Sequence, residues 1–329
     1  MDFEKAVALI NNAKSILLTT HTKPDGDACG CLAAMREVFS ALDKRDTLLL
    51  LSPLPYWYEF LFDDKPFIFG RDVNLEDLTE GRLGEFDLIL IVDTGSTSQL
   101  PEFDKYLKVN NKPVLVIDHH KTSNHLGCVE LVDSKAAATG LIVFDLFKFA
   151  NWPITEKVAQ ALFVAVAADT GWFQFSNTDN RVFQTCAELI KLGANPTKSF
   201  RELFQNFSLP RLKLIAAMLN TLELHFDSRF ATQYLLQQDF EQTGATDEDT
   251  ENLVNECQRI RTVEVAALFV ELKDGRIKCS LRSSGGIDVC KIAEKFGGGG
   301  HKMAAGLYLQ DSLSDVMQMI VEEVEKRLQ

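Results

Sequence analysis

Short apolar runs alternate with longer segments in which apolar residues recur at helical spacing. Residues 15–20, Ser-Ile-Leu-Leu-Thr-Thr, form the first run, and its continuous apolar character is typical of a strand buried in a parallel sheet. Further strands are predicted at 48–51, 86–92 and 114–117, and helices at 3–13, 32–42, 136–150 and 157–168. This alternation predicts the α/β class, with a doubly wound, mainly parallel sheet and helices on both faces.

The pattern changes after residue 220, where strands predominate. A capped helix over 181–192, closed by Gly193, is predicted to end the first domain, and 198–220 is predicted as connecting helix. Strands are then predicted at 230–236, 263–272 and 276–282, followed by a helix at 289–295 and four glycines. We therefore expect a first domain at 1–193, a helical linker at 194–220, and a second, smaller α/β domain at 221–329 across a cleft.

Ionisable side chains follow the ends of several predicted elements. His21, Asp25 and Asp27 come directly after the first strand, at the carboxyl edge where open α/β sheets build ligand sites. Gly26 is expected to let the backbone turn between the two aspartates. Similar acidic or histidine-bearing turns recur three more times downstream. The candidate set is His21, Asp25, Asp27, Asp93, His119, His120 and Asp169.

The chemistry of this set favours divalent metal ions. Carboxylates held close together repel each other unless a positive charge lies between them. Mixed imidazole and carboxylate donors suit Mn²⁺ or Mg²⁺ better than structural zinc, and four carboxylates suffice for two ions, which can clamp the oxygens of a phosphoryl transfer. Taken singly, each aspartate is also explained as a helix cap or a turn residue, so it is their recurrence that favours a metal site.

Composition and charge narrow the class of protein. The 329 residues are 46% hydrophobic and 25% charged, which indicates a globular protein long enough for two domains. No apolar run is long enough to span a membrane, residues 1–5 do not resemble a signal peptide, and seven cysteines, an odd number, favour reduced thiols in the cytoplasm. The net charge of −13 opposes long DNA or RNA as a partner, but not a short phosphate ligand beside bound metal ions.

Five motifs resemble those of a known family. Four of them resemble, in order and context, the motifs of the DHH phosphoesterases: His21 with Pro24-Asp25-Gly26-Asp27, Asp93-Thr94-Gly95, Asp118-His119-His120 and Asp169-Thr170-Gly171. Residues 296–306 resemble the glycine-rich signature of the DHH-associated C-terminal domain. The resemblance covers nearly the whole chain and is closest to stand-alone nanoRNase and pAp-phosphatase type proteins. One departure is Cys31, where the family usually has serine, and we expect it to affect helix-start packing more than catalysis.

The resemblance implies a catalytic first domain that holds two Mn²⁺ ions, with Mg²⁺ as an alternative. A bridging water activated by the metals would attack phosphorus. Asp118 would orient an imidazole through its other nitrogen, and His120 would contact a substrate phosphate oxygen or the leaving group, or would pack beside the strand end. The implied ligands are His21, Asp25 and Asp93 for one ion, and Asp27, Asp93, His119 and Asp169 for the other.

Candidate substrate contacts lie mainly in the second domain. Consecutive glycines bring backbone N–H groups close to a phosphate, although a flexible loop also explains such a run. Arg282 can bind a phosphate through two parallel hydrogen bonds. Trp172, Phe173 and Phe175 either stack on a base or pack in the core, and packing is the simpler interpretation. The resemblance implies substrate contacts by His120, Arg282, Ser283, Ser284, Gly298, Gly299, Gly300 and His301.

Together these features predict a cytoplasmic, Mn²⁺-dependent hydrolase of phosphodiester or phosphomonoester bonds in very short nucleotides. Candidate substrates are linear dinucleotides such as pApA, oligoribonucleotides of a few residues (nanoRNA), and pAp. The alternatives are a single-strand exonuclease, an inorganic pyrophosphatase or exopolyphosphatase, and a nucleotide-binding regulator. The acidity of the chain weighs against the exonuclease. The glycine-rich motif weighs against the pyrophosphatase or exopolyphosphatase, and the complete set of ligands weighs against the regulator. No membrane partner is expected, and a homodimer is left open.

Overall fold

The computed structural model describes residues 1–328, with the side chain of His301 outside the described part. The chain forms two compact units, Met1–Asn206 and Phe207–Gln329. The segment expected as a linker, 194–220, is divided between them, because α8 (Pro196–Phe204) belongs to the first unit and α9 (Leu209–Asn220) to the second. Leu214 and Met218 of α9 are fully buried in the core of the second unit, so this helix is a structural part of that unit.

The first unit is built on a six-stranded sheet whose neighbouring strands are all parallel. Its strands, in the order β3-β2-β1-β4-β5-β6, are β1 (Ser15–Thr20), β2 (Arg45–Leu50), β3 (Phe67–Ile68), β4 (Leu88–Val92), β5 (Val114–Asp118) and β6 (Val129–Val132). The chain winds outward from β1 to β3 and then returns to β4 beside β1, which makes this pair a topological switch point. The predicted doubly wound parallel sheet is confirmed.

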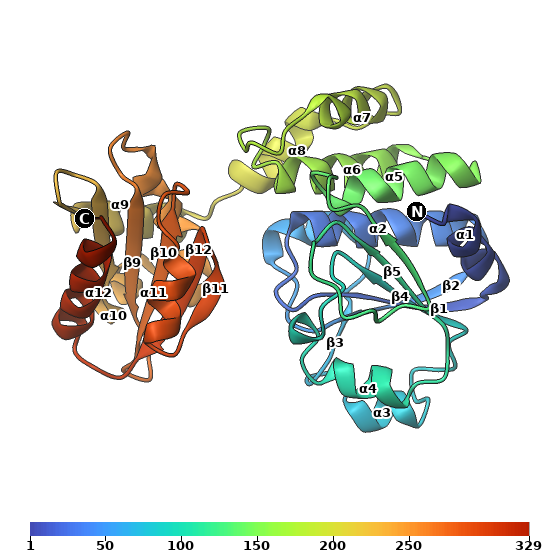
Figure 1. The fold of residues 1–329 in the computed structure, drawn as a ribbon, viewed down its shortest axis with the longest axis horizontal. Helices are drawn as coiled ribbons and strands as arrows, with labels where there is room; N and C mark the ends of the chain where they lie inside the picture. The colour runs from blue at the N-terminus through green and yellow to red at the C-terminus, as the bar shows by residue number, and fades with distance from the viewer. Residues whose placement is uncertain (329) are drawn as a thin grey trace. The chain divides into compact units, whose positions relative to one another are not determined.

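Alternating side chains divide the interior of the first unit into two cores. Ile16 and Leu18 of β1 belong to one core and Leu17 to the other, because successive residues of a strand face opposite sides. Figure 1 shows helices on both sides of the sheet. The larger core includes α1 (Phe3–Asn12), α2 (Gly26–Ala41), α5 (Thr139–Ala150), α6 (Glu156–Asp169) and α7 (Asn180–Lys191), and the smaller includes α3 (Leu75–Thr79) and α4 (Phe103–Val109).

Helices α2 and α6 approach each other so closely that only glycine fits at two contact positions. A Cβ atom on Gly30 would overlap the carbonyl oxygen of Ala161, and one on Gly26 would overlap the side chain of Ala168. Gly26 has no left-handed backbone, so the expectation that it turns the chain between two aspartates is wrong, and its role is close packing. This contact brings the first turn of α2 beside the last turn of α6.

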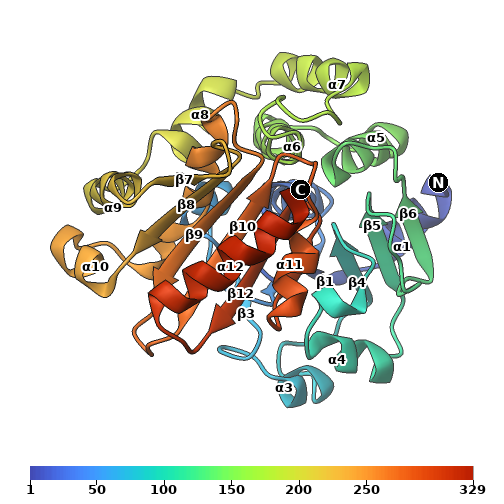
Figure 2. The same cartoon turned by 60° about the vertical axis from the view of Figure 1, so that its left-hand side comes forward.

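The second unit has its own six-stranded sheet, mostly antiparallel, with one parallel pair, β8 and β9. Its order is β11-β12-β10-β9-β8-β7, and Figure 2 shows α11 and α12 crossing one face. The strands are β7 (Glu223–His225), β8 (Phe230–Leu235), β9 (Val265–Glu271), β10 (Ile277–Ser283), β11 (Gly299–His301) and β12 (Ala304–Leu309). Besides α9, the helices are α10 (Gln237–Thr243), α11 (Val289–Lys295) and α12 (Leu313–Leu328). A second α/β unit is thus confirmed.

Short 3₁₀ helices complete the fold, at Tyr56–Leu61 and Thr97–Gln99 in the first unit and at Asp247–Thr250 and Leu253–Arg259 in the second. Asp247, Glu248 and Asp249 lie in the first turn of the third of these. Within residues 1–328, none of the helices combines the length and apolar character needed to cross a bilayer.

Candidate functional site

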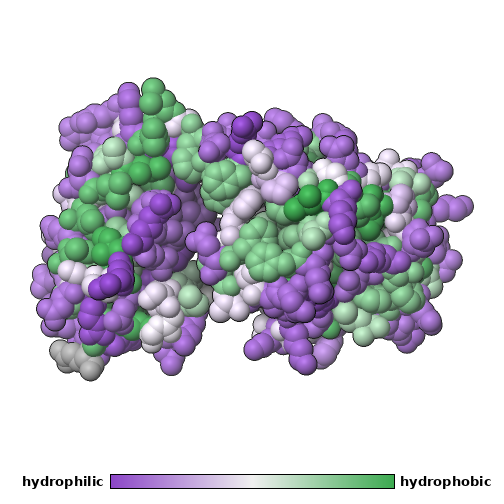
Figure 3. Space-filling model, turned by 90° about the horizontal axis from the view of Figure 1, so that it is seen from above, coloured by the Kyte–Doolittle hydropathy of each residue, from purple (hydrophilic) through white to green (hydrophobic). Residues whose placement is uncertain are grey.

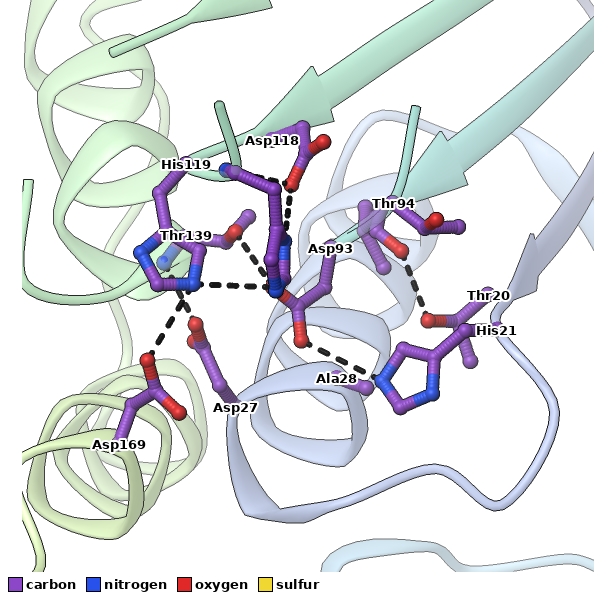
Figure 4. Close-up of polar contacts among 12 residues, drawn as sticks. Thr20, His21, Asp27, Ala28, Asp93, Thr94, Asp118, His119, Thr139 and Asp169 are labelled. Atoms are coloured by element: carbon purple, nitrogen blue, oxygen red, sulfur yellow. Dashed lines mark hydrogen bonds and ion pairs between the residues drawn. The ribbon is translucent and has the colours of Figure 1, made fainter. Parts of the chain in front are cut away.

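The ionisable side chains of the four motifs lie together at the carboxyl edge of the first sheet (Figure 4). His21 follows β1, Asp93 follows β4 and His119 follows β5, whereas Asp27 lies in the first turn of α2 and Asp169 ends α6. Among the described residues, three groups have donor atoms within 4.8 Å of one another and could each hold a metal ion. The groups are His21 with Asp25 and Asp93, Asp27 with His119 and Asp169, and Asp93 with His119 and His120.

The first group surrounds one oxygen of Asp93. Nε2 of His21 lies 3.5 Å from Asp93 Oδ2 and 4.0 Å from Asp25 Oδ1. Nδ1 of His21 donates to the carbonyl oxygen of Thr22 (2.9 Å), which leaves the lone pair of Nε2 directed at the carboxylates. Asp25 also caps α2, because its Oδ1 accepts from the N–H of Asp27 at 3.0 Å. α2 therefore begins within the motif, earlier than the sequence predicted.

The second group faces the other oxygen of Asp93. Nε2 of His119 lies 3.2 Å from Asp169 Oδ2 and 3.6 Å from Asp93 Oδ1. Nδ1 of His119 donates to the carbonyl oxygen of Ala136 (3.1 Å), which again leaves the lone pair of Nε2 directed at the carboxylates. Asp93 thus presents Oδ2 to the first group and Oδ1 to the second, which is the arrangement of a bridging ligand.

The buried carboxyl groups can all be ionised at once only if a cation lies among them. Asp27 is fully buried and Asp93 is nearly so. Burial first, and neighbouring carboxylates second, raise the pKa of both side chains well above the usual range. Burial and Asp25 also raise the pKa of Asp169 to about 6. A divalent ion among these oxygens would offset both the burial of the charges and the repulsion between the carboxylates. Oxygen and imidazole donors suit such an ion, so the residues fit a metal centre.

Asp118 pairs with His120. Its Oδ1 accepts from the backbone N–H of His120 at 3.1 Å and from the ring Nδ1 at 2.7 Å. Burial alone would raise the pKa of Asp118. The two hydrogen bonds from His120 have the larger combined effect, so the pKa of Asp118 is lowered. The hydrogen bond with Asp118 outweighs burial and raises the pKa of His120 to about 9. The imidazole that Asp118 contacts is therefore that of His120, whose side chain is 47% exposed.

Arg282, Ser283 and Ser284 lie at the end of β10, in the second unit. The guanidinium of Arg282 donates to the carbonyl oxygen of Leu281 at 3.1 Å, and burial lowers its pKa. Ser283 is buried and its Oγ accepts from the N–H of Gly285, so this hydroxyl stabilises the following turn. Ser284 Oγ lies 3.4 Å from the carbonyl oxygen of Glu264. Of the three, Arg282 has the side chain best suited to hold a phosphate.

The glycine run forms a strand pair instead of a flexible loop. Residues 299–301 pair with 304–306 in the β11–β12 hairpin. A Cβ on Gly298 would overlap the carbonyl oxygen of Gly306, and one on Gly300, where φ is +144°, would lie 2.5 Å from that of Ala304. A Cβ on Gly299 would meet no described atom within 4 Å. Packing therefore explains Gly298 and Gly300, whereas no packing contact requires a glycine at position 299.

The aromatic residues after Asp169 mostly pack within the first unit. Trp172 and Phe173 contact the larger core, with ring centres 6.2 and 6.1 Å from that of Phe163. The rings of Phe163, Trp172 and Phe173 also line an open pocket of about 490 Å³, together with Phe200 of α8. Phe175 is 59% exposed. Figure 3 looks onto the side of this unit that carries α7 and α8, where apolar side chains interrupt the polar surface. Packing explains Trp172 and Phe173, as the sequence favoured.

Four hydrogen bonds to the aspartates of the site, made by three residues, were missed in the sequence. Thr139 donates from its hydroxyl to Asp93 Oδ1 (2.8 Å) and from its backbone to Asp27 Oδ2 (2.5 Å). The N–H of Gly140 donates to Asp27 Oδ1 (2.9 Å), and Cys31 Sγ donates to the same oxygen (3.4 Å). In the sequence, Thr-Gly was visible only as part of a small-residue helix, with nothing to connect it to the acidic motifs.

Known proteins resemble both halves of the chain. The DHH family, N-terminal domain, matches residues 15–166, and the DHHA1 domain matches residues 227–329. The chain is 30% identical over 317 residues to the bifunctional oligoribonuclease and PAP phosphatase NrnA of Thermus thermophilus, covering 95% of this chain and 90% of that protein. An exopolyphosphatase-related protein from Bacteroides fragilis shares the fold with a TM-score of 0.92 at 21% identity, over 98% and 95% of the two chains. Exonuclease RecJ bound to manganese does so with a TM-score of 0.58 at 18% identity, over 99% and 95%.

Proposed function

This chain belongs to the DHH family, and from that premise we propose that it is a metal-dependent hydrolase of very short nucleotides. The proposed reactions are cleavage of the phosphodiester bond in pApA-like dinucleotides and short oligoribonucleotides, and removal of a phosphate from pAp. The relative from Thermus thermophilus is named for an oligoribonuclease and a PAP phosphatase activity, and it aligns with this chain over nearly the full length of both proteins.

The two oxygens of Asp93 carry the chemical part of this proposal. Each faces a separate group of imidazole and carboxylate donors, 3.5 Å from His21 Nε2 on one side and 3.6 Å from His119 Nε2 on the other. Two divalent ions, with Mn²⁺ preferred over Mg²⁺, would activate a water and stabilise the attacking and leaving oxygens of phosphoryl transfer when bound. We assign them to His21, Asp25 and Asp93, and to Asp27, Asp93, His119 and Asp169.

His120 is the side chain that we assign to the substrate in the first unit. Its Nδ1 is committed to Asp118, which leaves Nε2 for an oxygen of the scissile phosphate or of the leaving group. The hydrogen bond with Asp118 raises the pKa of His120 to about 9, which favours a protonated ring that can donate from Nε2.

The second unit is proposed to bind the rest of the nucleotide. Arg282 supplies a guanidinium for a phosphate, and the open backbone at Gly299 supplies N–H groups, with Ser283, Ser284, Gly298, Gly300 and His301 as the remaining candidates. Binding energy gained away from the scissile phosphate positions that phosphate for reaction. The cysteines of the described chain are free thiols, which supports a reducing, cytoplasmic location.

A substrate screen tests the proposal. Purified protein with Mn²⁺ should hydrolyse pApA and pAp, and should be inactive after chelation. Asp93→Ala should abolish turnover while the protein stays folded by circular dichroism, because the variant loses the shared ligand and relieves carboxylate repulsion. Cyclic di-AMP and pyrophosphate serve as comparison substrates. Exclusive hydrolysis of pyrophosphate, or wild-type turnover of Asp93→Ala saturated with Mn²⁺, would contradict the proposed function or the bridging role.

A further inference from the structure

We propose that Thr139, at the N-terminus of α5, is a positioning residue that fixes the orientation of Asp93 and Asp27 as ligands. The inference rests on the proposed metal centre and adds a residue outside the four acidic and histidine motifs. Figure 4 shows Thr139 beside both aspartates, on the helix that begins after β6. Thr139 is fully buried, so its hydroxyl acts inside the protein and not on the substrate.

The hydroxyl of Thr139 sets which oxygen of Asp93 faces which group. It donates to Oδ1 at 2.8 Å, the oxygen that lies 3.6 Å from His119 Nε2. Oδ2 is then left to face His21, at 3.5 Å. A carboxylate rotates readily about its Cβ–Cγ bond, because that torsion has no steep staggered minima. A hydrogen bond to one oxygen removes this freedom and holds the carboxylate so that each oxygen serves a different group.

The backbone of the same helix turn holds Asp27. The N–H of Thr139 donates to Oδ2 at 2.5 Å and that of Gly140 to Oδ1 at 2.9 Å. The N-cap residue of α5, Ala138, has no side chain able to accept from these groups, so the carboxylate of Asp27, from another helix, caps α5 in its place. The positive end of the twelve-residue helix also favours the charged form of this buried carboxylate.

Gly140 is required for this approach. A Cβ there would lie 2.7 Å from the Cβ of Ala165 and 3.3 Å from Asp27 Oδ1. A larger residue would therefore push α5 away from α6 and from the carboxylate it caps. Thr139 and Gly140 act as a pair, one through its hydroxyl and both through their N–H groups, to hold two ligands that come from different elements.

The sharpest test removes the hydroxyl and keeps the shape. Thr139→Val leaves the backbone donors in place, so Asp27 stays held while Asp93 becomes free to rotate. Mn²⁺ binding measured by isothermal titration calorimetry should weaken by about 10–100-fold, the usual cost of losing a ligand's orienting partner. Turnover of pApA should recover in part at high Mn²⁺, with little change in the KM for the nucleotide. Thr139→Ser should keep wild-type Mn²⁺ affinity.

Thr185→Val, at a buried threonine of α7, is the matched control and should leave Mn²⁺ affinity unchanged. If Thr139→Val does not fold, Thr139→Ala and Thr139→Ser give the same comparison. Wild-type Mn²⁺ affinity in a folded Thr139→Val or Thr139→Ala would overturn the inference while the proposed function stands. Absence of Mn²⁺ binding by the wild-type protein would instead overturn the proposed function, and this inference with it.

Discussion

At the scale of single residues, hydrogen bonds orient the side chains that we propose as metal ligands. His21 and His119 each donate Nδ1 to a backbone carbonyl, so both present Nε2 to the carboxylates. The carboxylate of Asp27 accepts more hydrogen bonds than either histidine makes, from two backbone N–H groups and from the thiol of Cys31. Burial and the neighbouring carboxylates raise the pKa of that thiol, so it stays protonated and able to donate.

Replacing Cys31 tests whether the thiol acts as this donor. Cys31→Ser supplies a stronger donor of similar size, so Mn²⁺ affinity and turnover should equal or exceed those of the wild type. Cys31→Ala removes one of three donors to Asp27, and the loss of Mn²⁺ affinity should fall near the lower end of the about 10–100-fold range for orienting partners. Calorimetric titration measures both, with Cys186→Ser, a buried cysteine of α7, as control. Equal losses in the serine and alanine variants would contradict a donor role.

The residues of this cluster could be identified in the sequence because each lies at or next to the end of a recognisable strand or helix. The side chains that orient them could not, because their contacts join distant parts of the sequence. Thr139 lies 46 residues from Asp93 and 112 from Asp27, and no local pattern marks it as their partner. Cys31 was noticed as a departure from serine, but its contact with Asp27 became visible only once one turn of α2 had brought the two together.

At the scale of elements, glycines set how closely two backbones approach. Gly26 and Gly30 allow α2 to lie against α6, which brings Asp27 of one helix near Asp169 of the other. In the second unit, Gly298 and Gly300 allow β11 to lie against β12. These positions stabilise the fold. Gly299 lies in the same hairpin without such a contact, and we propose it as the position at which a phosphate approaches the backbone.

Alanine substitutions should separate these two roles. Gly298→Ala forces a Cβ into the carbonyl oxygen of Gly306 and should destabilise the protein by about 1–3 kcal/mol in thermal or urea unfolding. Gly299→Ala should leave stability unchanged but weaken turnover of pApA, because the added methyl group hinders a phosphate. Hydrolysis of a small artificial phosphodiester that needs only the metal centre should be unaffected by Gly299→Ala. Equal effects of this variant on both substrates would argue against a nucleotide contact.

Long apolar elements were easier to predict than short or mixed ones. β1, β4 and β5 are buried over almost their whole length and stood out as apolar runs. β3 has two residues and β6 is mostly half-buried, so neither produced such a run, although both complete the sheet. The segment expected as one connecting helix is broken at residues 205–208, where Ser208 caps α9.

At the scale of the whole molecule, the net negative charge limits the length of nucleic acid that can bind. The net charge of −13 repels each added phosphate of a nucleic acid unless a local basic strip compensates. The lysines nearest the glycine run in sequence, Lys291, Lys295 and Lys302, are scattered. Lys295 is moreover paired with Glu323 at 2.5 Å. The charges available for phosphate binding in this part of the chain therefore suffice for one or two phosphates.

Catalytic efficiency should fall as the substrate lengthens. Two or three nucleotides offer few phosphates beyond those that Arg282, the glycine run and the metal centre are proposed to bind, whereas longer chains add repulsion without adding contacts. Measuring kcat/KM for RNA of two, three, five and twelve nucleotides at one salt concentration tests this. A flat or rising series would reject the short-substrate proposal and favour an exonuclease that tracks along a polymer.

The division of the chain also implies an order of events during synthesis. Every side chain assigned to a metal lies between residues 21 and 169, inside the unit that ends at Asn206. Domains fold as they leave the ribosome, N-terminal first. The nascent first unit can therefore assemble its ligands, and acquire metal from its surroundings, before Arg282 has been translated. The unit that carries the proposed metal ligands is therefore complete before the unit that we propose to bind the nucleotide.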